Sequence, residues 1–384
     1  MMGALDSMNR RGEMGLGEKL AHLSWGLILL VVTIAGIGVL LLYSAGGGHW
    51  EPWAGRQAVR FGLGLVAMFA VALVDLRVWL RLAYPVYAAT LLLLVGVEVM
   101  GQMGMGAQRW INLGFIQIQP SELMKIALTL ALARWFHSLP PDQVNRPVLL
   151  LPPLALILVP VGLVLLQPNL GTAMLLVLGS GMLFWGAGIP AWIFAGAGAL
   201  GIAALPVGWT FLHDYQKERI FTFLNPEADP LGSGYNIMQS KIAFGSGGLF
   251  GKGFLQGSQS QLAFLPEKHT DFIFVVLAEE FGMVGALFLL SLYAAVLAYG
   301  IGIALGSRNQ FGRLLALGVS CTLFLYIVVN VAMITGLIPV VGIPLPLVSY
   351  GGTAMLTLLI GIGLLLCVAV HKEVRLSKSG LAEW

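Results

Sequence analysis

An aspartate stands where a polar stretch ends and an apolar segment begins. Asp271 follows Thr270, and an apolar run of membrane-spanning length starts at Phe272. We expect Thr270 to cap a helix whose first turn holds Asp271, so the helix dipole favours the charged carboxylate while partial burial disfavours it. A carboxylate balanced in this way suits a general base near neutral pH. The alternative is that Asp271 only caps its helix.

A second pair of ionisable residues lies three positions apart in another apolar segment. Glu122 and Lys125 follow Gln119-Pro120-Ser121, a helix start, so they share one face of a helix. The pair could neutralise itself and so let the helix enter a membrane. Alternatively, it lines a polar cavity in which Lys125 holds an anionic group, because charges at membrane depth usually mark a site or a pathway.

Other polar residues are open to two interpretations. His269 could carry a proton or bind a ligand, although no neighbouring His, Cys or carboxylate has the spacing of a zinc site. Arg109 and Trp110 are typical of an interfacial anchor, but together they could also bind phosphate and stack on a sugar. Glu279 and Glu280 point to different sides of a helix, and we expect one of them to pair with a basic or backbone group as part of the structure.

Composition places these residues in a membrane protein. The 384 residues are 58% hydrophobic and only 10% charged, with a mean hydropathy of +0.88. A soluble globular domain does not have this composition. The net charge of +3 does not indicate nucleic-acid binding. Cys321 and Cys367 lie in apolar runs, so we expect small core residues rather than a disulfide or a metal pair.

Ten apolar segments predict an all-α polytopic membrane protein with about ten transmembrane helices. The first is expected to be retained, because no small-residue cleavage site ends it. The chain forms a single membrane domain, with polar tails at residues 1–22 and 371–384 and one large loop, residues 210–270, between spans seven and eight. The segments are 23–43, 58–74, 82–100, 123–136, 148–166, 170–188, 191–209, 272–304, 314–338 and 345–370.

The basic residues predict the orientation of the chain. Twelve lie in the tails and short loops of one side, and three lie in the short loops of the other. This imbalance predicts cytoplasmic termini and an extracytoplasmic loop at 210–270. The twelve are Arg10, Arg11, Lys19, Arg77, Arg81, Arg134, Arg146, Arg308, Arg313, Lys372, Arg375 and Lys378, and the three are Arg56, Arg60 and Arg109.

Two stretches rich in glycine or proline need separate interpretations. Gly245-Ser-Gly-Gly-Leu-Phe-Gly-Lys-Gly253 suggests a phosphate loop, but it has Ser246 in place of the first glycine and Gly253 in place of Ser or Thr. We expect no nucleotide binding there. Pro344-Leu-Pro-Leu-Val-Ser-Tyr-Gly-Gly352 predicts irregular backbone at membrane depth, which must be buried or line a watery cavity. We expect this cavity to open to the outer side near the ends of spans four, eight and ten.

Five motifs in order along nearly the whole chain resemble the signatures of the SEDS family (shape, elongation, division and sporulation). The resemblance implies a peptidoglycan glycosyltransferase that polymerises lipid II at the outer face of the bacterial inner membrane. It also implies a class B penicillin-binding protein, membrane lipids and other elongation-complex proteins as partners. Ile338-Pro-Val-Val-Gly-Ile-Pro-Leu-Pro346 is more similar to the rod-shape branch than to the division branch. The motifs are Arg109-Trp-Ile-Asn, Gln119-Pro-Ser-Glu-Leu-Met-Lys125, Phe264-Leu-Pro-Glu-Lys-His-Thr-Asp-Phe-Ile-Phe274 and the two stretches above.

The resemblance implies roles for individual residues. Asp271 matches the essential acid of the family, and Glu122 and Lys125 match residues that line its central cavity. We expect Asp271 to be the catalytic base, and a divalent cation (Mg²⁺ or Mn²⁺) held by Asp271 and Glu122 is left open. A flippase for a lipid-linked precursor and a non-catalytic scaffold are the alternatives; charges near the outer span ends and the lack of inverted repeats favour the enzyme. The expected substrate-binding residues are Glu122, Lys125, Arg109, Trp110, Lys268, His269 and Ser349.

Overall fold

The computed structural model describes residues 14–104, 107–112, 117–140, 143–144, 146–211, 214–225, 233–261, 268–374 and 376. Each of the ten predicted apolar segments coincides with a helix, because a chain in lipid must satisfy its backbone hydrogen bonds internally. These helices are α3 (Trp25–Ala45), α4 (Ala54–Leu73), α5 (Leu76–Met100), α6 (Pro120–Ser138), α7 (Leu151–Leu166), α8 (Leu170–Gly186), α9 (Ala191–Phe211), α13 (Ile273–Gly306), α14 (Gln310–Ile334) and α15 (Gly352–Val370).

The helices identify a multi-pass membrane protein. In the described part of the chain, seven helices are long and apolar enough to cross a membrane: α3, α4, α5, α7, α13, α14 and α15. The span at α7 begins within η3 (Pro147–Leu150) and covers Val148–Leu166. The apolar stretches counted at α8 and α9 are shorter, Leu170–Gly186 and Ala191–Ala204, and α6 carries Glu122, Lys125 and Arg134. The number of ten spans therefore stays a prediction.

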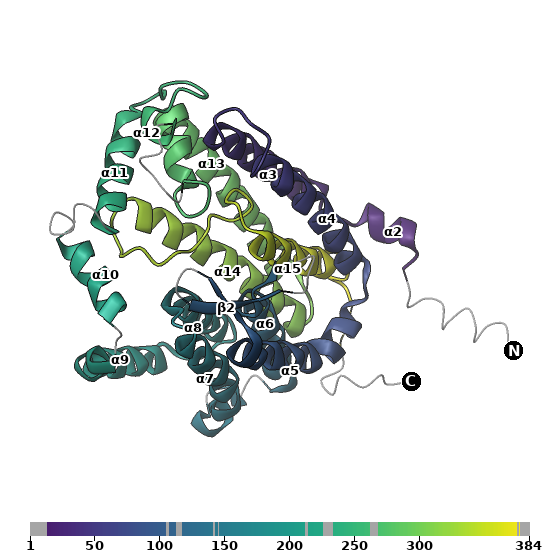
Figure 1. Cartoon of the computed structure of the whole chain (residues 1–384). Coiled ribbons are helices and arrows are strands. Elements are labelled where there is room, and N and C mark those ends of the chain that lie inside the picture. Colours follow the sequence, from purple (N-terminus) through teal and green to yellow (C-terminus); the bar gives the residue numbers. More distant parts are fainter. Residues whose placement is uncertain are drawn as a thin grey trace, which may run out of the picture.

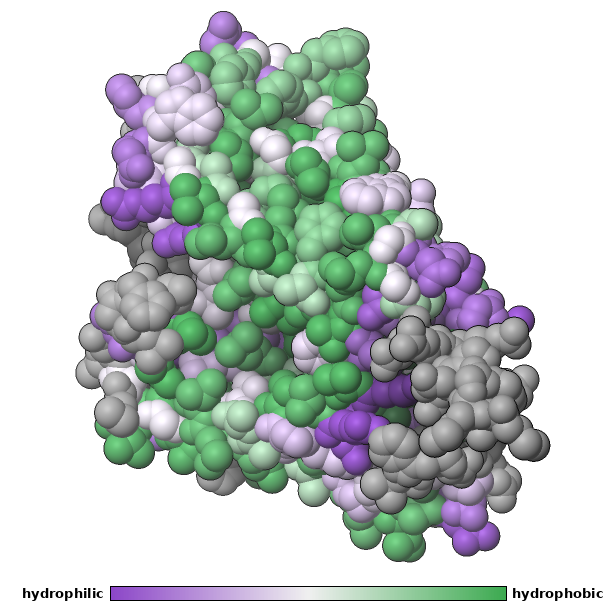
Figure 2. Space-filling model, turned by 90° about the vertical axis from the view of Figure 1, so that its right-hand side faces the viewer, coloured by the Kyte–Doolittle hydropathy of each residue, from purple (hydrophilic) through white to green (hydrophobic). Residues whose placement is uncertain are grey.

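Three helices form the centre of the bundle: α6, α14 and α15 (Figure 1). The spanning parts of α14 and α15 are 72% and 78% buried, against 22% for α4. The outer helices direct apolar side chains such as Leu29 and Val66 outward, and Figure 2 shows a broad hydrophobic surface over the middle of the molecule. The exterior is apolar, as lipid requires, and the charged groups at membrane depth are enclosed.

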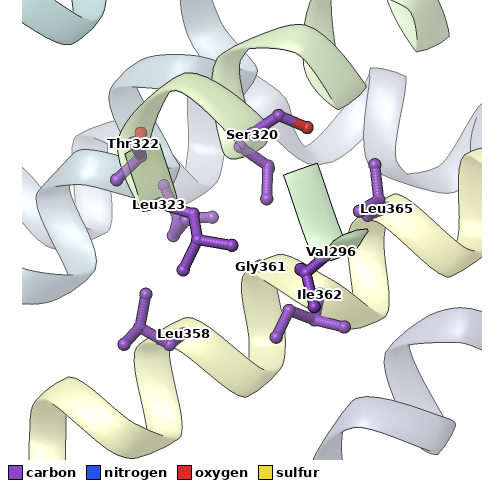
Figure 3. A pocket seen from close by; sticks show the side chains of 10 residues that line it. Val296, Ser320, Thr322, Leu323, Leu358, Gly361, Ile362 and Leu365 are labelled. Atoms are coloured by element: carbon purple, nitrogen blue, oxygen red, sulfur yellow. The ribbon is translucent and has the colours of Figure 1, made fainter. Parts of the chain in front are cut away.

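The middle of the core is apolar as well. A cavity of about 10 Å³ lies between α6, α13, α14 and α15, lined by aliphatic side chains together with Ser320 and Thr322 (Figure 3). Both hydroxyls donate to carbonyls of their own helix, at Ala316 and Gly318. The cavity is at the lower limit for one water molecule, so it is too small for a substrate or cofactor.

The all-α prediction missed a small antiparallel sheet between α5 and α6. Its strands are β1 (Gln102–Gly104), β2 (Ala107–Asn112) and β3 (Gln117–Ile118), in the order β1-β2-β3. The strands are too short for their alternation to stand out in the sequence. This sheet marks the end of the bundle that also holds residues 268–272 and 343–351, and we call this the sheet end.

The large loop and the tails contain helices of their own. Residues 212–213, 226–232 and 262–267 of the loop lie outside the described residues, as do Arg10, Arg11, Arg375 and Lys378 of the orientation argument. The described elements are α2 (Leu16–Ala21) in the first tail, η3 (Pro147–Leu150) before α7, and α10 (Asp214–Leu224), α11 (Ser233–Ser246) and α12 (Ser258–Gln261) in the loop.

The span predicted at 272–304 is a broken helix. Gly282 in α13 has φ +66° and ψ −162°, so the hydrogen-bond ladder of the helix stops there. The glycine-rich stretch replaces the missing partners. Met283 and Val284 donate their N–H groups to the carbonyls of Gly248 and Leu249 at 3.0 and 3.1 Å. This gives the stretch a structural role.

The carbonyls on the N-terminal side of the break also find partners in the glycine-rich stretch. The N–H groups of Lys252 and Gly253 donate to the carbonyls of Glu279 and Glu280, both at 3.0 Å. The Lys252 ammonium also pairs with the buried Glu279 carboxylate at 2.8 Å, which confirms that one of the two glutamates has a structural partner. Ser44 donates to the Glu280 carboxylate. The loop therefore fastens the half of α13 that follows Asp271.

Candidate active site

Asp271 lies in a turn and not in a helix. Residues 268–272 form turns, and α13 begins at Ile273 with Phe272 at its N-cap, so the expected cap at Thr270 is wrong. The reason is that the carbonyls around Asp271 bind groups far away in the chain. Asn330 donates to the Asp271 carbonyl at 3.0 Å, and Ser349 donates to the Thr270 carbonyl at 2.6 Å.

The third contact comes from Tyr350, whose N–H donates to the His269 carbonyl at 2.9 Å. Three successive carbonyls, those of residues 269, 270 and 271, are therefore bound by tertiary contacts. The Asp271 carboxylate lies against Gly342, since a Cβ placed there would be 3.5 Å from Oδ2. Gly342 has φ +71°, a conformation that glycine adopts at little cost.

The segment that holds this turn has the irregular backbone predicted for it. Residues 343–351 precede α15, which begins at Gly352 and not at residue 345. The segment folds on itself through Ser349, whose Oγ accepts the N–H of Leu345 at 2.7 Å. Gln57 on α4 donates to the Ser349 carbonyl at 2.9 Å, and Asn330 donates to the Ile343 carbonyl at 2.7 Å. The predicted binding residue Ser349 thus positions the backbone around Asp271.

Glu122 and Lys125 lie on one face of α6, as predicted, and both are buried with 5% of their surface exposed. The Lys125 ammonium is 2.6 Å from Glu122 Oε1. Tyr326 on α14 completes the cluster: its hydroxyl accepts from Lys125 and donates to Glu122 Oε2 at 2.5 Å. Lys125 Nζ also lies 4.4 Å from the centre of the Tyr326 ring. A carboxylate, an ammonium and a phenol form a closed buried network.

Helix α14 joins this network to the Asp271 turn. Tyr326 contacts Glu122 and Lys125, and Asn330 contacts Asp271. The two α14 residues are four positions apart, so they lie on one face in successive turns. Sequence reasoning missed both of them. Asn330, a fully buried amide at membrane depth, was the available signal.

Aromatic and cationic groups surround His269. Its ring stacks on Trp53, with centroids 4.6 Å apart and planes at 15°, and it meets the Tyr350 ring edge-on at 6.1 Å. The Arg60 guanidinium lies 4.6 Å from the Tyr350 ring centre. Next to His269, burial lowers the pKa of Lys268. Lys268 therefore loses its proton more readily there than it would in water.

Arg109 and Trp110 lie on β2, and both are partly buried. The Arg109 guanidinium donates to the carbonyls of Gln167, at 3.1 Å, and Pro168. These carbonyls follow the last turn of α7, so Arg109 ties the sheet to that helix end. This contact matches the anchor interpretation, and binding of phosphate or sugar by the pair stays a prediction.

The donor groups give little support to a resident metal ion. Among the residues that the structure describes, no three His, Cys, Asp or Glu side chains stand close enough to hold one. The Glu122 carboxylate is already engaged by Lys125 and Tyr326. The two cysteines are free, and Cys367 is buried as expected.

The fold and the enclosed charges at the sheet end define a multi-pass membrane protein with a candidate active site at one end of its bundle. A family model described as a cell cycle protein, FtsW/RodA/SpoVE, matches residues 23–374. The chain belongs to this family, which is the SEDS family. It is 44% identical over 365 residues to the peptidoglycan glycosyltransferase MrdB of Escherichia coli K12, covering 93% of this chain and 96% of that protein.

Solved structures agree with the family assignment. A chain from a peptidoglycan synthase complex that coordinates polymerization and crosslinking is 36% identical, with a TM-score of 0.81 over 92% of this chain and 99% of that one. The rod shape determining protein RodA of Thermus thermophilus is 34% identical, with a TM-score of 0.70 over 92% and 98%. The overall fold is therefore that of the RodA structures.

Proposed function

We propose that this chain is a peptidoglycan glycosyltransferase that polymerises lipid II into glycan strands during cell elongation. The observation that carries the proposal is the fixed position of Asp271, whose turn is bound through three successive carbonyls. The buried network of Glu122, Lys125 and Tyr326 lies one turn away along α14. The relative from Escherichia coli, which carries this activity in its name, supports the same chemistry.

The reaction needs a base and a stabilised leaving group. Lipid II carries an α-linked diphosphate whereas the polymer linkage is β, so each transfer inverts the anomeric carbon. A single displacement does this without a covalent intermediate, by the logic of inverting glycosidases. The Asp271 carboxylate takes the proton of the acceptor 4-hydroxyl, the freed oxygen attacks the donor anomeric carbon, and the diphosphate leaves with the bonding electrons.

Lys125 is the proposed donor to the departing diphosphate. An ammonium has three N–H groups, and Glu122 and Tyr326 engage two of them. Those contacts fix the direction of the third, which can stabilise charge that develops on the leaving group. We assign no step to a divalent cation; one held by Asp271 and Glu122 would add charge stabilisation at the diphosphate.

We place the reaction at the outer face of the bacterial inner membrane, with both termini in the cytoplasm. The twelve basic residues on one side, against three on the other, support this orientation. We also propose a class B penicillin-binding protein as the partner. The solved relative from a complex that coordinates polymerization and crosslinking supports this choice.

A polymerisation assay tests the function. The purified chain and its partner are incubated with fluorescent lipid II and moenomycin, which blocks the other polymerase family, and the products are separated on a gel. We expect glycan strands from the wild type and a loss of about 100-fold or more in rate for Asp271→Asn, because general bases contribute this much. Asp271→Asn should keep its fold and its binding of lipid II.

Asp75→Asn is the matched control. Asp75 caps α5 by accepting the N–H of Arg77 at 2.7 Å, so an amide there preserves the cap. We expect this variant to polymerise at the normal rate. A normal rate for Asp271→Asn would refute the base assignment, and no product from the wild type under any condition would favour a flippase or a scaffold.

A further inference from the structure

A cavity of about 480 Å³ opens between α3, α13 and α15 at the opposite end from the candidate active site. Its volume lies in the range of about 300–1,000 Å³ that small-molecule sites occupy. α3 begins at Trp25, α13 ends at Gly306 and α15 ends at Val370. Three spanning helices therefore begin or end around the cavity, which places it at the depth of the lipid headgroups.

The polar side of the cavity consists of hydrogen-bond donors. His22, Ser24, Tyr299 and Lys372 line it. No side-chain hydrogen bond or ion pair joins any of these four to another described residue, and Ser24 does not cap α3 with its hydroxyl. No described carboxylate lines the cavity. Nearby, Glu373 is paired with Arg308 at 2.8 Å, so its charge is compensated.

The position of the donors suits a phosphate. Gly26 lies in the first turn of α3, and the Tyr299 hydroxyl packs directly on its Cα, where a side chain would collide with it. The hydroxyl therefore lies against the first turn of α3, which is the positive end of its dipole, and Ser24 lines the same cavity. An ammonium, two hydroxyls and a helix N-terminus around one space are complementary to an anion.

The other wall of the cavity is apolar and open. Gly302 and Gly306 line it one helical turn apart on α13, and a Cβ at either position would meet nothing within 4 Å. A ligand that fills this space has an anionic head beside Lys372 and an apolar part along α13. Free phosphate supplies only the first of these features.

We propose that this cavity binds the headgroup of an anionic phospholipid. Its phosphate oxygens accept from Lys372, Ser24 and Tyr299, and an acyl chain runs along α13 past Gly302. The site is separate from every residue assigned to polymerisation, so its test does not depend on that activity.

Native mass spectrometry of the full-length protein, released from detergent, tests the proposal. The probes are phosphatidylglycerol and phosphatidylcholine with identical acyl chains, and inorganic phosphate. We expect phosphatidylglycerol to bind about tenfold more tightly than phosphatidylcholine, and Lys372→Gln to lose about this factor, as for one hydrogen bond to a charged group. Arg313→Gln, a change at an exposed arginine at the same end, should bind like the wild type.

A second variant separates binding from charge. Gly302→Leu leaves all four polar side chains in place and puts a side chain into the open space, where its Cβ meets nothing within 4 Å, so we expect it to fold and to lose phosphatidylglycerol. Unchanged binding in both Gly302→Leu and Lys372→Gln would refute the site. If phosphatidylcholine binds as tightly as phosphatidylglycerol, the cavity does not select anionic headgroups and the proposal is wrong. If inorganic phosphate competes fully, the ligand is free phosphate and not a lipid. A wild-type dimer that Gly302→Leu dissociates would show that a second copy, and not lipid, occupies the cavity.

Discussion

Tyr326 shows how one hydroxyl makes a buried ion pair tolerable. Enclosing a carboxylate and an ammonium is costly unless their remaining hydrogen-bonding groups are satisfied. The phenol satisfies both partners at once, because it accepts from Lys125 and donates to Glu122. Thr129 adds a bond from its hydroxyl to the Lys125 carbonyl at 2.8 Å. The pair is therefore held in one geometry, as the proposed contact of Lys125 with the leaving group requires.

Removing one charge of this network should destabilise the fold more than removing both charges. We expect Lys125→Met to lower the free energy of unfolding by about 3–5 kcal/mol, because Glu122 is then a buried charge without its partner. The double variant Glu122→Gln and Lys125→Met should be more stable than Lys125→Met alone. Thermal unfolding in detergent measures both. A double variant that is less stable than the single one would contradict this account.

The stability of the protein should also depend on pH through His371. This buried residue follows the last turn of α15, and its Nδ1 lies 2.9 Å from the Cys367 carbonyl, to which it donates. Burial lowers the pKa of His371 below its usual value, with the Cys367 carbonyl acting in the opposite direction. The folded state thus binds its proton less readily than the unfolded chain does.

The sign of the pH effect follows from this shift. The stabilising contribution of neutral His371 is present above the unfolded pKa of about 6.5 and is lost as the pH falls below it. We expect the midpoint of thermal unfolding to fall between pH 7.5 and pH 5, with a smaller fall in His371→Gln. His49→Gln, a change at an exposed histidine, should keep the wild-type slope. Equal slopes in all three proteins would exclude His371 as the cause.

At the scale of elements, the break in α13 ties the turn around Asp271 to the large loop. The first half of α13 follows Asp271 directly and ends at Gly282, where the loop supplies its missing hydrogen-bond partners. The loop approaches so closely that a Cβ at Gly251 would overlap the Glu280 carbonyl, and Gly251 also has φ +80°. A glycine is required at this contact.

Gly251→Ala should therefore weaken the fold and the activity together. We expect the alanine to push the loop away from the break, to lower the melting temperature, and to reduce the rate of glycan synthesis through displacement of the Asp271 turn. Gly245→Ala is the control in the same stretch, because a Cβ there meets nothing within 4 Å and Gly245 is helical. A polymerisation assay and a thermal melt are compared for the two variants. Equal losses of stability and activity in the two variants would refute the role of the close contact between Gly251 and Glu280.

The elements differ in how well the sequence predicts them. Apolar runs predict helices because their signal is local, and a spacing of three places Glu122 beside Lys125 for the same reason. The partner of that pair, Tyr326, is 201 residues away from Lys125. The Thr270 cap failed because Asn330, Ser349 and Tyr350 bind the backbone first. Contacts between residues so far apart in the sequence form only when the helices pack together, and a local sequence pattern carries no information about that packing.

At the scale of the whole molecule, the described parts of both tails lie at one end of the bundle. The Lys372 carbonyl accepts the N–H of Arg308 at 3.0 Å, and Lys19 donates to the Leu73 carbonyl at 2.8 Å. The first part of the chain therefore meets the end of α4, and the last part meets the end of α13. We therefore expect an even number of membrane crossings between them.

Reporter fusions test the direction of this arrangement. We expect a fluorescent protein fused after Trp384 to be bright, and alkaline phosphatase inserted at Gln256 in the large loop to be active, because the proposed orientation places both termini in the cytoplasm. Phosphatase at the C-terminus should be inactive. The reverse pattern of activity would invert the proposed orientation and remove Asp271 from the outer face.

The turn around Asp271 separates the location of a side chain from its chemistry. Asn330, Ser349 and Tyr350 bind only main-chain carbonyls there, and every amino acid carries those carbonyls. Another residue at position 271 will therefore emerge from the same point and in the same direction. An inactive Asp271→Cys protein could then regain its acid from a thiol reagent that carries a carboxylate. The length of that reagent would measure how far the reacting hydroxyl lies from the backbone.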